Sequence, residues 1–121
     1  MKANNKWLIA IDFDGVIAKK WHKPKEVIAD SFAAIRKFIN EWYCVYIFTA
    51  RRPKEVIDFM YDKVTWWLKF EIIPYYYNFW DKHWIIWISN KKLPADIYID
   101  DNAYRFTGDW NKTYSDISKM I

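Results

Sequence analysis

The stretch "WLIAIDFDGV", residues 7–16, joins a run of apolar residues to two carboxylates and a glycine. Its nearly continuous apolar composition up to Phe13 is typical of a strand buried on both faces of a parallel sheet. Because alternate residues of a strand point the same way, Asp12 and Asp14 are expected to lie side by side. Two close carboxylates repel each other unless a proton or a cation lies between them. The pair is therefore either a solvated strand end or a site for a positive group.

The rest of the chain alternates strand-like apolar runs with amphipathic segments. Apolar residues recur at helical spacing in three segments, and Pro24 and Pro53 suit the first turns of two of them. This alternation predicts βαβ units and a parallel sheet in an α/β fold. The expected strands are residues 7–13, 43–49, 71–77 and 95–100, and the expected helices are residues 25–41, about 53–67 and about 109–121.

Polar side chains follow these strands at their carboxyl ends. Asp12 and Asp14 end the first strand, Thr49 ends the second, and Asp100 and Asp101 end the last. In parallel α/β sheets, ligands bind beyond the carboxyl ends of the strands, near a change in strand order. The sequence therefore predicts that the functional site lies at this edge of the sheet.

Length and composition favour one domain. The 121 residues are 53% hydrophobic, which is enough to bury a core. No apolar run approaches the ~18 residues that span a bilayer, and the start lacks a signal-peptide cleavage site, so we expect a cytoplasmic protein. The single cysteine, Cys44, lies in an apolar run and is expected to be a buried thiol. The net charge of +4 either suits a phosphorylated or nucleic-acid partner or reflects an ordinary solvated surface.

Gly15 directly follows the second carboxylate of "DFDG". A residue without Cβ lets backbone amides approach a ligand closely, so this turn could bind a hard cation and, through it, a phosphate. Mg²⁺ suits such a site because it prefers oxygen ligands and uses one or two carboxylates plus substrate phosphate. Thr49 either donates to a phosphoryl oxygen or caps a turn. Lys91 or Lys92 either reaches a phosphate or lies on the surface.

The segments "DFDGV", "FTAR", "KK" and "IDD" occur in this order, each in a strand context. Their order resembles the four motifs of the haloacid dehalogenase-like (HAD) superfamily of phosphotransferases, over about residues 7–104. More narrowly, "IAIDFDGVI", "TARR" and "KLPADIYIDD" look like the small, capless HAD proteins of bacteria and their phages. The resemblance implies a three-layer, Rossmann-like parallel sheet flanked by helices, in a single domain over residues 1–121 without a separate cap domain.

The resemblance also implies a role for each residue of the motifs. Asp12 would be the nucleophile that attacks phosphorus and becomes an aspartyl phosphate. Asp14 would protonate the leaving oxygen and then activate water. Mg²⁺ would be held by Asp12, the backbone carbonyl of Asp14 and Asp100, with Asp101 behind them or bound through water. The implied substrate-binding residues are Gly15, Thr49, Ala50, Arg51 and Lys92, with Lys91 as the alternative lysine.

Residues 75–90 are dense in aromatic side chains. They could pack on the core, form an interface between copies of the chain, cover the site as a lid, or stack nucleotide bases. Of these alternatives, we expect core packing or a homo-oligomer interface.

The order of the motifs and the resemblance that it carries imply a Mg²⁺-dependent phosphatase, a hydrolase of phosphomonoesters that works through an aspartyl phosphate. A small phosphorylated molecule is the expected substrate, and a phosphate at a nucleic-acid end is the alternative, because the chain is basic and the site would be open. The rival hypothesis is a non-catalytic module that binds metal or phosphate or assembles with a partner. A pure binding role does not need Asp14 in addition to Asp12, which favours the enzyme.

Overall fold

The computed structural model describes residues 7–20, 26–63, 68–73, 82, 84–91, 93–100 and 108–120. Its centre is a five-stranded sheet in the order β3-β4-β2-β1-β5, in which every pairing is parallel. This confirms the predicted α/β class, with a Rossmann-like parallel sheet flanked by helices. The strands are β1 (Leu8–Asp12), β2 (Cys44–Phe48), β3 (Lys69–Ile72), β4 (Ile85–Ser89) and β5 (Ile97–Ile99), and the helices are α1 (Ser31–Asn40), α2 (Pro53–Lys63) and α3 (Trp110–Met120).

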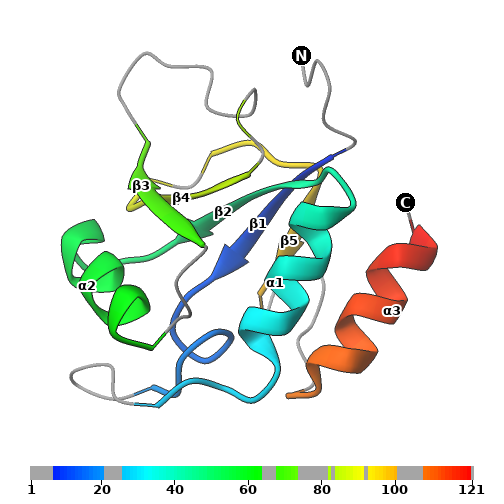
Figure 1. The fold of residues 1–121 in the computed structure, drawn as a ribbon, viewed down its shortest axis with the longest axis horizontal. Helices are drawn as coiled ribbons and strands as arrows, with labels where there is room; N and C mark the ends of the chain where they lie inside the picture. The colour runs from blue at the N-terminus through cyan, green and yellow to red at the C-terminus, as the bar shows by residue number, and fades with distance from the viewer. Residues whose placement is uncertain are drawn as a thin grey trace.

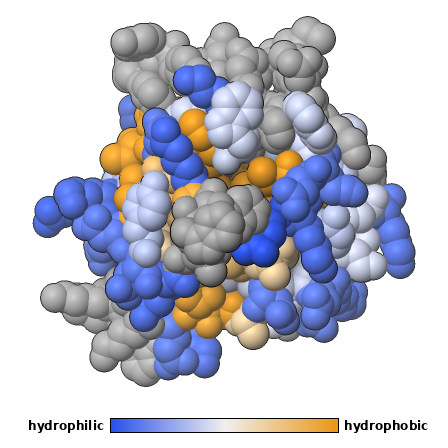
Figure 2. Space-filling view, viewed as in Figure 1, coloured by the Kyte–Doolittle hydropathy of each residue, from blue (hydrophilic) through white to orange (hydrophobic). Residues whose placement is uncertain are grey.

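The core is built on both faces of the sheet, because alternate strand residues point to opposite faces. Ile9 and Ile11 of β1 belong to the larger cluster of buried side chains, to which all three helices contribute. Leu8 and Ala10 belong to a smaller cluster on the other face. Helix α1 lies in front of β1 and β5, α3 lies beside α1, and α2 lies beside β3 (Figure 1). Hydrophilic side chains dominate the rim of this view, with hydrophobic ones visible between them (Figure 2).

The connection between β4 and β5 covers the smaller cluster. The Tyr46 hydroxyl donates to the Leu93 carbonyl at 2.7 Å and accepts from the Leu93 amide at 2.8 Å. The Tyr98 hydroxyl donates to the same carbonyl at 2.7 Å and accepts from the Ala95 amide at 2.9 Å. In the described part of the chain, the sheet is thus the middle layer between three helices and this tethered connection.

The expected start of the first helix, at residue 25, is wrong. Ala18 forms an antiparallel bridge with Val27, and the Ile28 amide donates to the Ile17 carbonyl at 2.7 Å. A short hairpin therefore follows the acidic motif, and α1 begins only at Ser31. The β-branched pair Val27 and Ile28 favours this extended conformation over a helix. Residues 21–25, which include Pro24, lie outside the described part.

The other two helices begin as expected. Pro53 is the first residue of α2, where its fixed φ and missing N–H are tolerated. The Asp109 carboxylate caps α3 by accepting from the amides of Asn111 at 2.9 Å and Lys112 at 3.2 Å. No described helix has both the length and the apolar character that crossing a bilayer requires.

One strand was missed. Ile85–Ser89 form β4, which lies buried between β2 and β3. This part of the aromatic segment 75–90 therefore packs in the core, while residues 74–81 lie outside the described part. The strand expected over residues 71–77 is observed as Lys69–Ile72, and it ends before Pro74, which cannot donate to a strand ladder.

Candidate active site

The acidic motif ends β1 and turns sharply. The Phe13 carbonyl accepts hydrogen bonds from the amides of Val16, Ile17 and Ala18 at 3.3, 2.9 and 3.1 Å. The Gly15 amide donates to the Ala18 carbonyl at 2.7 Å, and its φ of +82° lies in the region that favours glycine. The turn therefore depends on a glycine directly after Asp14.

A cavity of about 340 Å³ opens beside this turn. It lies at the carboxyl edge of the sheet, because it is bordered by the ends of β1 and β2. Four predicted site residues, Asp12, Asp14, Gly15 and Ala50, share this space. The described residues that line it are Asp12, Asp14, Gly15, Val16, Lys20, Phe48 and Ala50.

Asp100 follows β5 and is almost fully buried. Because Ile99 is the register partner of Ile11, the next residue, Asp100, is brought level with Asp12 on the neighbouring strand. Adjacent strands lie about 4.8 Å apart, so the sheet places these two acidic residues next to each other. Asp101 and Lys92 lie outside the residues that the structure describes.

Arg51 contacts Asp14, and this pairing was not foreseen. Arg51 Nε donates to both carboxylate oxygens, at 3.1 Å to Oδ1 and 3.0 Å to Oδ2, and Nη2 donates to Oδ1 at 2.9 Å. Nη1 donates to Glu55 Oε2 at 3.1 Å. The hydrogen bond with Asp14 is the main reason that the pKa of Arg51 is raised. In this arrangement Arg51 holds the orientation of a carboxylate at the cavity.

Thr49 is buried, and its side chain stabilises a turn. Its Oγ1 accepts from the Arg51 amide at 3.0 Å, and its own amide donates to the Ser89 carbonyl at 3.0 Å. Ser89 repeats the pattern at the end of β4, where its Oγ accepts from the Lys91 amide at 3.0 Å. A hydroxyl can still donate while it accepts, so the turn role of Thr49 leaves a phosphate contact open. The signal for Ser89 was a hydroxyl after the apolar run "IIWI".

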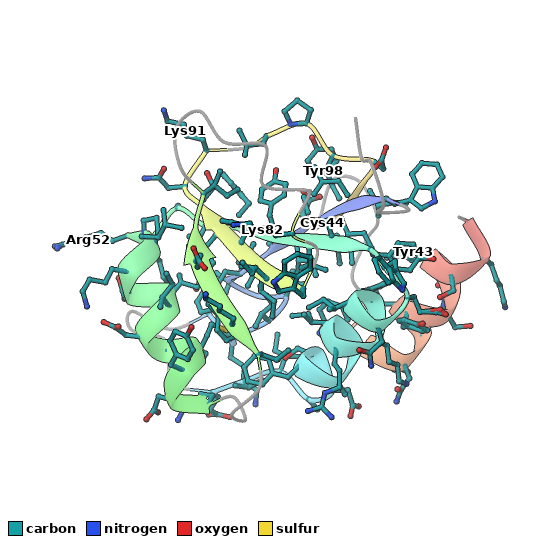
Figure 3. All side chains as sticks on the ribbon, turned by 45° about the horizontal axis from the view of Figure 1, so that its top comes forward. Tyr43, Cys44, Arg52, Lys82, Lys91 and Tyr98 are labelled. Carbon is teal, nitrogen blue, oxygen red and sulfur yellow. The ribbon has the colours of Figure 1, made fainter. Side chains whose placement is uncertain are left out.

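Two lysines lie at this edge of the sheet in different places. Lys20 lines the carboxylate cavity. Lys91 lines a separate pocket with Pro53 and Ser89, and its side chain points outward in Figure 3. Lys20 was missed because it lies five residues beyond Gly15 in sequence, and only the hairpin returns it to the turn.

The carboxylate oxygens of Asp12 and Asp14 line the cavity and are of the type that binds a hard cation, whereas Asp100 is not among the described residues that line it. The expected donors are the carboxylates of Asp12 and Asp100 and the backbone carbonyl of Asp14, while Arg51 holds the Asp14 carboxylate. Mg²⁺ needs few protein ligands, because water and substrate phosphate complete its shell. Among the described residues, no three His, Cys, Asp or Glu side chains form a metal-binding group of their own. A cation here would therefore rely on the carbonyl, on water and on substrate.

Comparison with known proteins bears on the fold. No family model and no curated protein matches the chain. A solved structure of a conserved protein from Bacteroides thetaiotaomicron is similar over 97% of this chain and 93% of that chain, with a TM-score of 0.62 and 19% sequence identity. At this identity the likeness shows a shared fold alone, and the function has to be argued from the cavity.

Proposed function

We propose that the protein is a Mg²⁺-dependent phosphatase that hydrolyses phosphomonoesters through an aspartyl phosphate on Asp12. The observation that carries this proposal is the cavity at the carboxyl edge of the sheet, which Asp12 and Asp14 line beside Gly15. The register that brings Asp100 level with Asp12 supports it further. A paired carboxylate set at this edge suits phosphoryl transfer, which requires mainly positioning and charge neutralisation.

In the first step a carboxylate oxygen of Asp12 forms a bond to phosphorus while the bond to the leaving oxygen breaks. Asp14, in its protonated form, gives its proton to that oxygen, so an alcohol leaves. In the second step Asp14 takes a proton from water, whose oxygen bonds to phosphorus as the acyl phosphate bond to Asp12 breaks. The products are inorganic phosphate and the regenerated carboxylate.

The other residues position these groups. Arg51 holds the ionised Asp14 carboxylate through both of its oxygens, and we assign it a positioning role here. One of these hydrogen bonds would open when Asp14 carries the proton. To the Thr49 hydroxyl, which closes the turn before Arg51, we assign the role of donor to a phosphoryl oxygen. Bound Mg²⁺ would neutralise charge that develops on the phosphoryl oxygens.

The test is phosphate release from a panel of phosphoesters, measured with Mg²⁺ and with chelator. The panel holds an aryl phosphate, sugar phosphates, nucleotides, and oligonucleotides phosphorylated at the 3′ or 5′ end. Asp12→Asn should abolish metal-dependent release. Asp58→Asn is the matched control, because Asp58 is an exposed carboxylate on α2 that pairs with Lys54 at 3.0 Å.

Each outcome of this panel has a clear meaning. Release that Asp12→Asn abolishes and Asp58→Asn retains would support the aspartyl phosphate mechanism, and the best substrate would define the subclass. Release that survives Asp12→Asn would contradict Asp12 as the nucleophile. Absence of release from a folded, Mg²⁺-binding protein would favour the non-catalytic module.

A further inference from the structure

The side chain of Lys20 lies directly over Gly15. A Cβ built on Gly15 would be 2.8 Å from Lys20 Cε, 3.6 Å from Cγ and 3.7 Å from Cδ. The same lysine lines the cavity that holds Asp12 and Asp14. The missing Cβ of Gly15 therefore gives the lysine stem room to lie against the acidic turn.

The hairpin after the acidic motif separates Lys20 from its neighbour. The Lys19 amide donates to the Glu26 carbonyl at 2.9 Å, and Lys19 Nζ pairs with Glu26 Oε2 at 3.0 Å. Within the described residues, Lys20 has no carboxylate partner. Arg51, the other cation near the cavity, already binds Asp14 and Glu55. Lys20 therefore brings a positive charge to the cavity that no described acidic residue neutralises.

We propose that Lys20 binds an anionic group on the leaving portion of the substrate. This inference rests on the proposed phosphatase function, in which Asp14 protonates the leaving oxygen. Because Gly15 follows Asp14 and the Lys20 stem lies on Gly15, Lys20 is next to the residue that would protonate the leaving oxygen, and we assign its ammonium group to the leaving-group side of the cavity. The substrate class is a phosphomonoester whose alcohol carries a second acidic group, either a carboxylate or a phosphodiester.

The first test compares two substrates that differ only in charge. 3-Carboxyphenyl phosphate carries the acidic group, and 3-carbamoylphenyl phosphate is its neutral, nearly isosteric partner. We expect wild-type kcat/KM to favour the carboxylate about tenfold, as a charge-assisted hydrogen bond would. Lys20→Met should reduce this ratio to about one, Lys20→Arg should largely restore it, and Lys19→Met should leave it intact. An equal ratio in wild type and Lys20→Met would overturn the proposal.

A binding measurement keeps the inference separate from the proposed function. In an Asp12→Asn background, which should not turn over substrate, the dissociation constants of the two esters are measured with and without Lys20→Met. The same roughly tenfold preference, lost with Lys20, supports the site even if wild type releases no phosphate. A preference that is absent, or that persists in Lys20→Met, overturns it whatever the activity is.

The source of the anionic group is resolved by a second pair of ligands. Thymidine 3′-phosphate lacks a phosphodiester, whereas the thymidine dinucleotide with a 3′-phosphate has one beside the terminal phosphate. A Lys20-dependent gain for the dinucleotide would assign the site to nucleic-acid ends. A Lys20-dependent gain for the carboxylate ester alone would assign it to small phosphorylated acids.

Discussion

The indole of Trp110 connects α3 to the turn that follows the acidic motif. Trp110 Nε1 donates to the Val16 carbonyl at 2.9 Å, and both residues are buried. Trp110→Phe would keep an aromatic ring in the core but remove the donor. We expect the turn that carries Gly15 to loosen, because its carbonyl at Val16 loses this partner.

The size of the effect follows from burial. A buried acceptor left without its partner costs about 1 to 3 kcal/mol, and the space left by the smaller ring adds about 1 kcal/mol. The free energy of unfolding should therefore fall by about 2 to 4 kcal/mol, out of about 5 to 15 kcal/mol for a domain. With a slope of about 2 kcal/mol per molar urea, the unfolding midpoint should fall by about 1 to 2 M.

Trp87→Phe is the matched control. Trp87 is equally buried, but it lies in the other core cluster, and its Nε1 donates to the carbonyl of the exposed residue Lys82 at 3.2 Å. Water can replace that donor, so its loss should cost less. Unfolding is followed by far-UV circular dichroism, because removal of a tryptophan alters fluorescence.

Hydrogen exchange gives the decisive comparison. The Gly15 amide, which donates to the Ala18 carbonyl, should exchange faster in Trp110→Phe and at the wild-type rate in Trp87→Phe. The reasoning would be refuted by a Trp110→Phe midpoint within about 0.3 M of wild type. Equal acceleration of Gly15 exchange in both variants would refute it as well.

Three further predictions concern Arg51, Cys44 and Gly15. Arg51→Ala should lower kcat about 10- to 100-fold, because the acid–base carboxylate of Asp14 would be misplaced. Arg52→Ala removes a side chain that points away from the protein (Figure 3) and should change kcat less than about twofold. Equal effects of the two substitutions would contradict the positioning role of Arg51. Burial raises the pKa of Cys44 from 9.0 to about 12, so an aromatic disulfide reagent at pH 8 should label the thiol only in urea. The contribution of the buried Cys44 thiol to stability should be complete below pH 9 and be lost as the pH rises toward 12, because in that range only the unfolded state ionises the thiol. Rapid labelling of the folded protein would disprove the burial of Cys44. Gly15→Ala and Gly108→Ala should each lower the free energy of unfolding, measured in urea, by about 1 to 2 kcal/mol, because both glycines have positive φ. Only Gly15→Ala should lower activity. Unchanged activity in Gly15→Ala would show that the turn tolerates a Cβ.

The sequence predicted the edge at which the acidic residues gather, for a reason that does not depend on strand order. All strands of a parallel sheet end at the same edge, so residues that follow apolar runs meet there. Asp12, Thr49 and Asp100 could be placed in this way from three short segments. Their relative positions could not, because adjacency depends on the order β2-β1-β5, which no local pattern encodes.

The missed features depend on contacts between distant residues. The run "IIWIS" is five residues long and follows a segment rich in aromatics, so its apolar pattern alone does not distinguish a strand from a packed loop. The hairpin at Val27 overrides the helical spacing that Ile28 shares with α1. Arg51 and Asp14 are 37 residues apart, and their pairing results from the geometry of two turns at neighbouring strand ends.

The charges around the cavity determine which groups could attract a phosphorylated substrate. Carboxylates that line a cavity repel a phosphate dianion unless the attraction of nearby cations offsets their charge. Arg51 cannot supply this attraction, because Asp14 and Glu55 occupy its guanidinium. In the described part of the chain, Lys20 is the cavity-lining cation without an acidic partner, and its exposed side chain lies over Gly15, on the side that we assign to the leaving portion of the substrate. Attraction of the phosphoryl group by a metal and of the leaving portion by Lys20 would therefore be separable, and a substrate with two acidic groups would benefit from both.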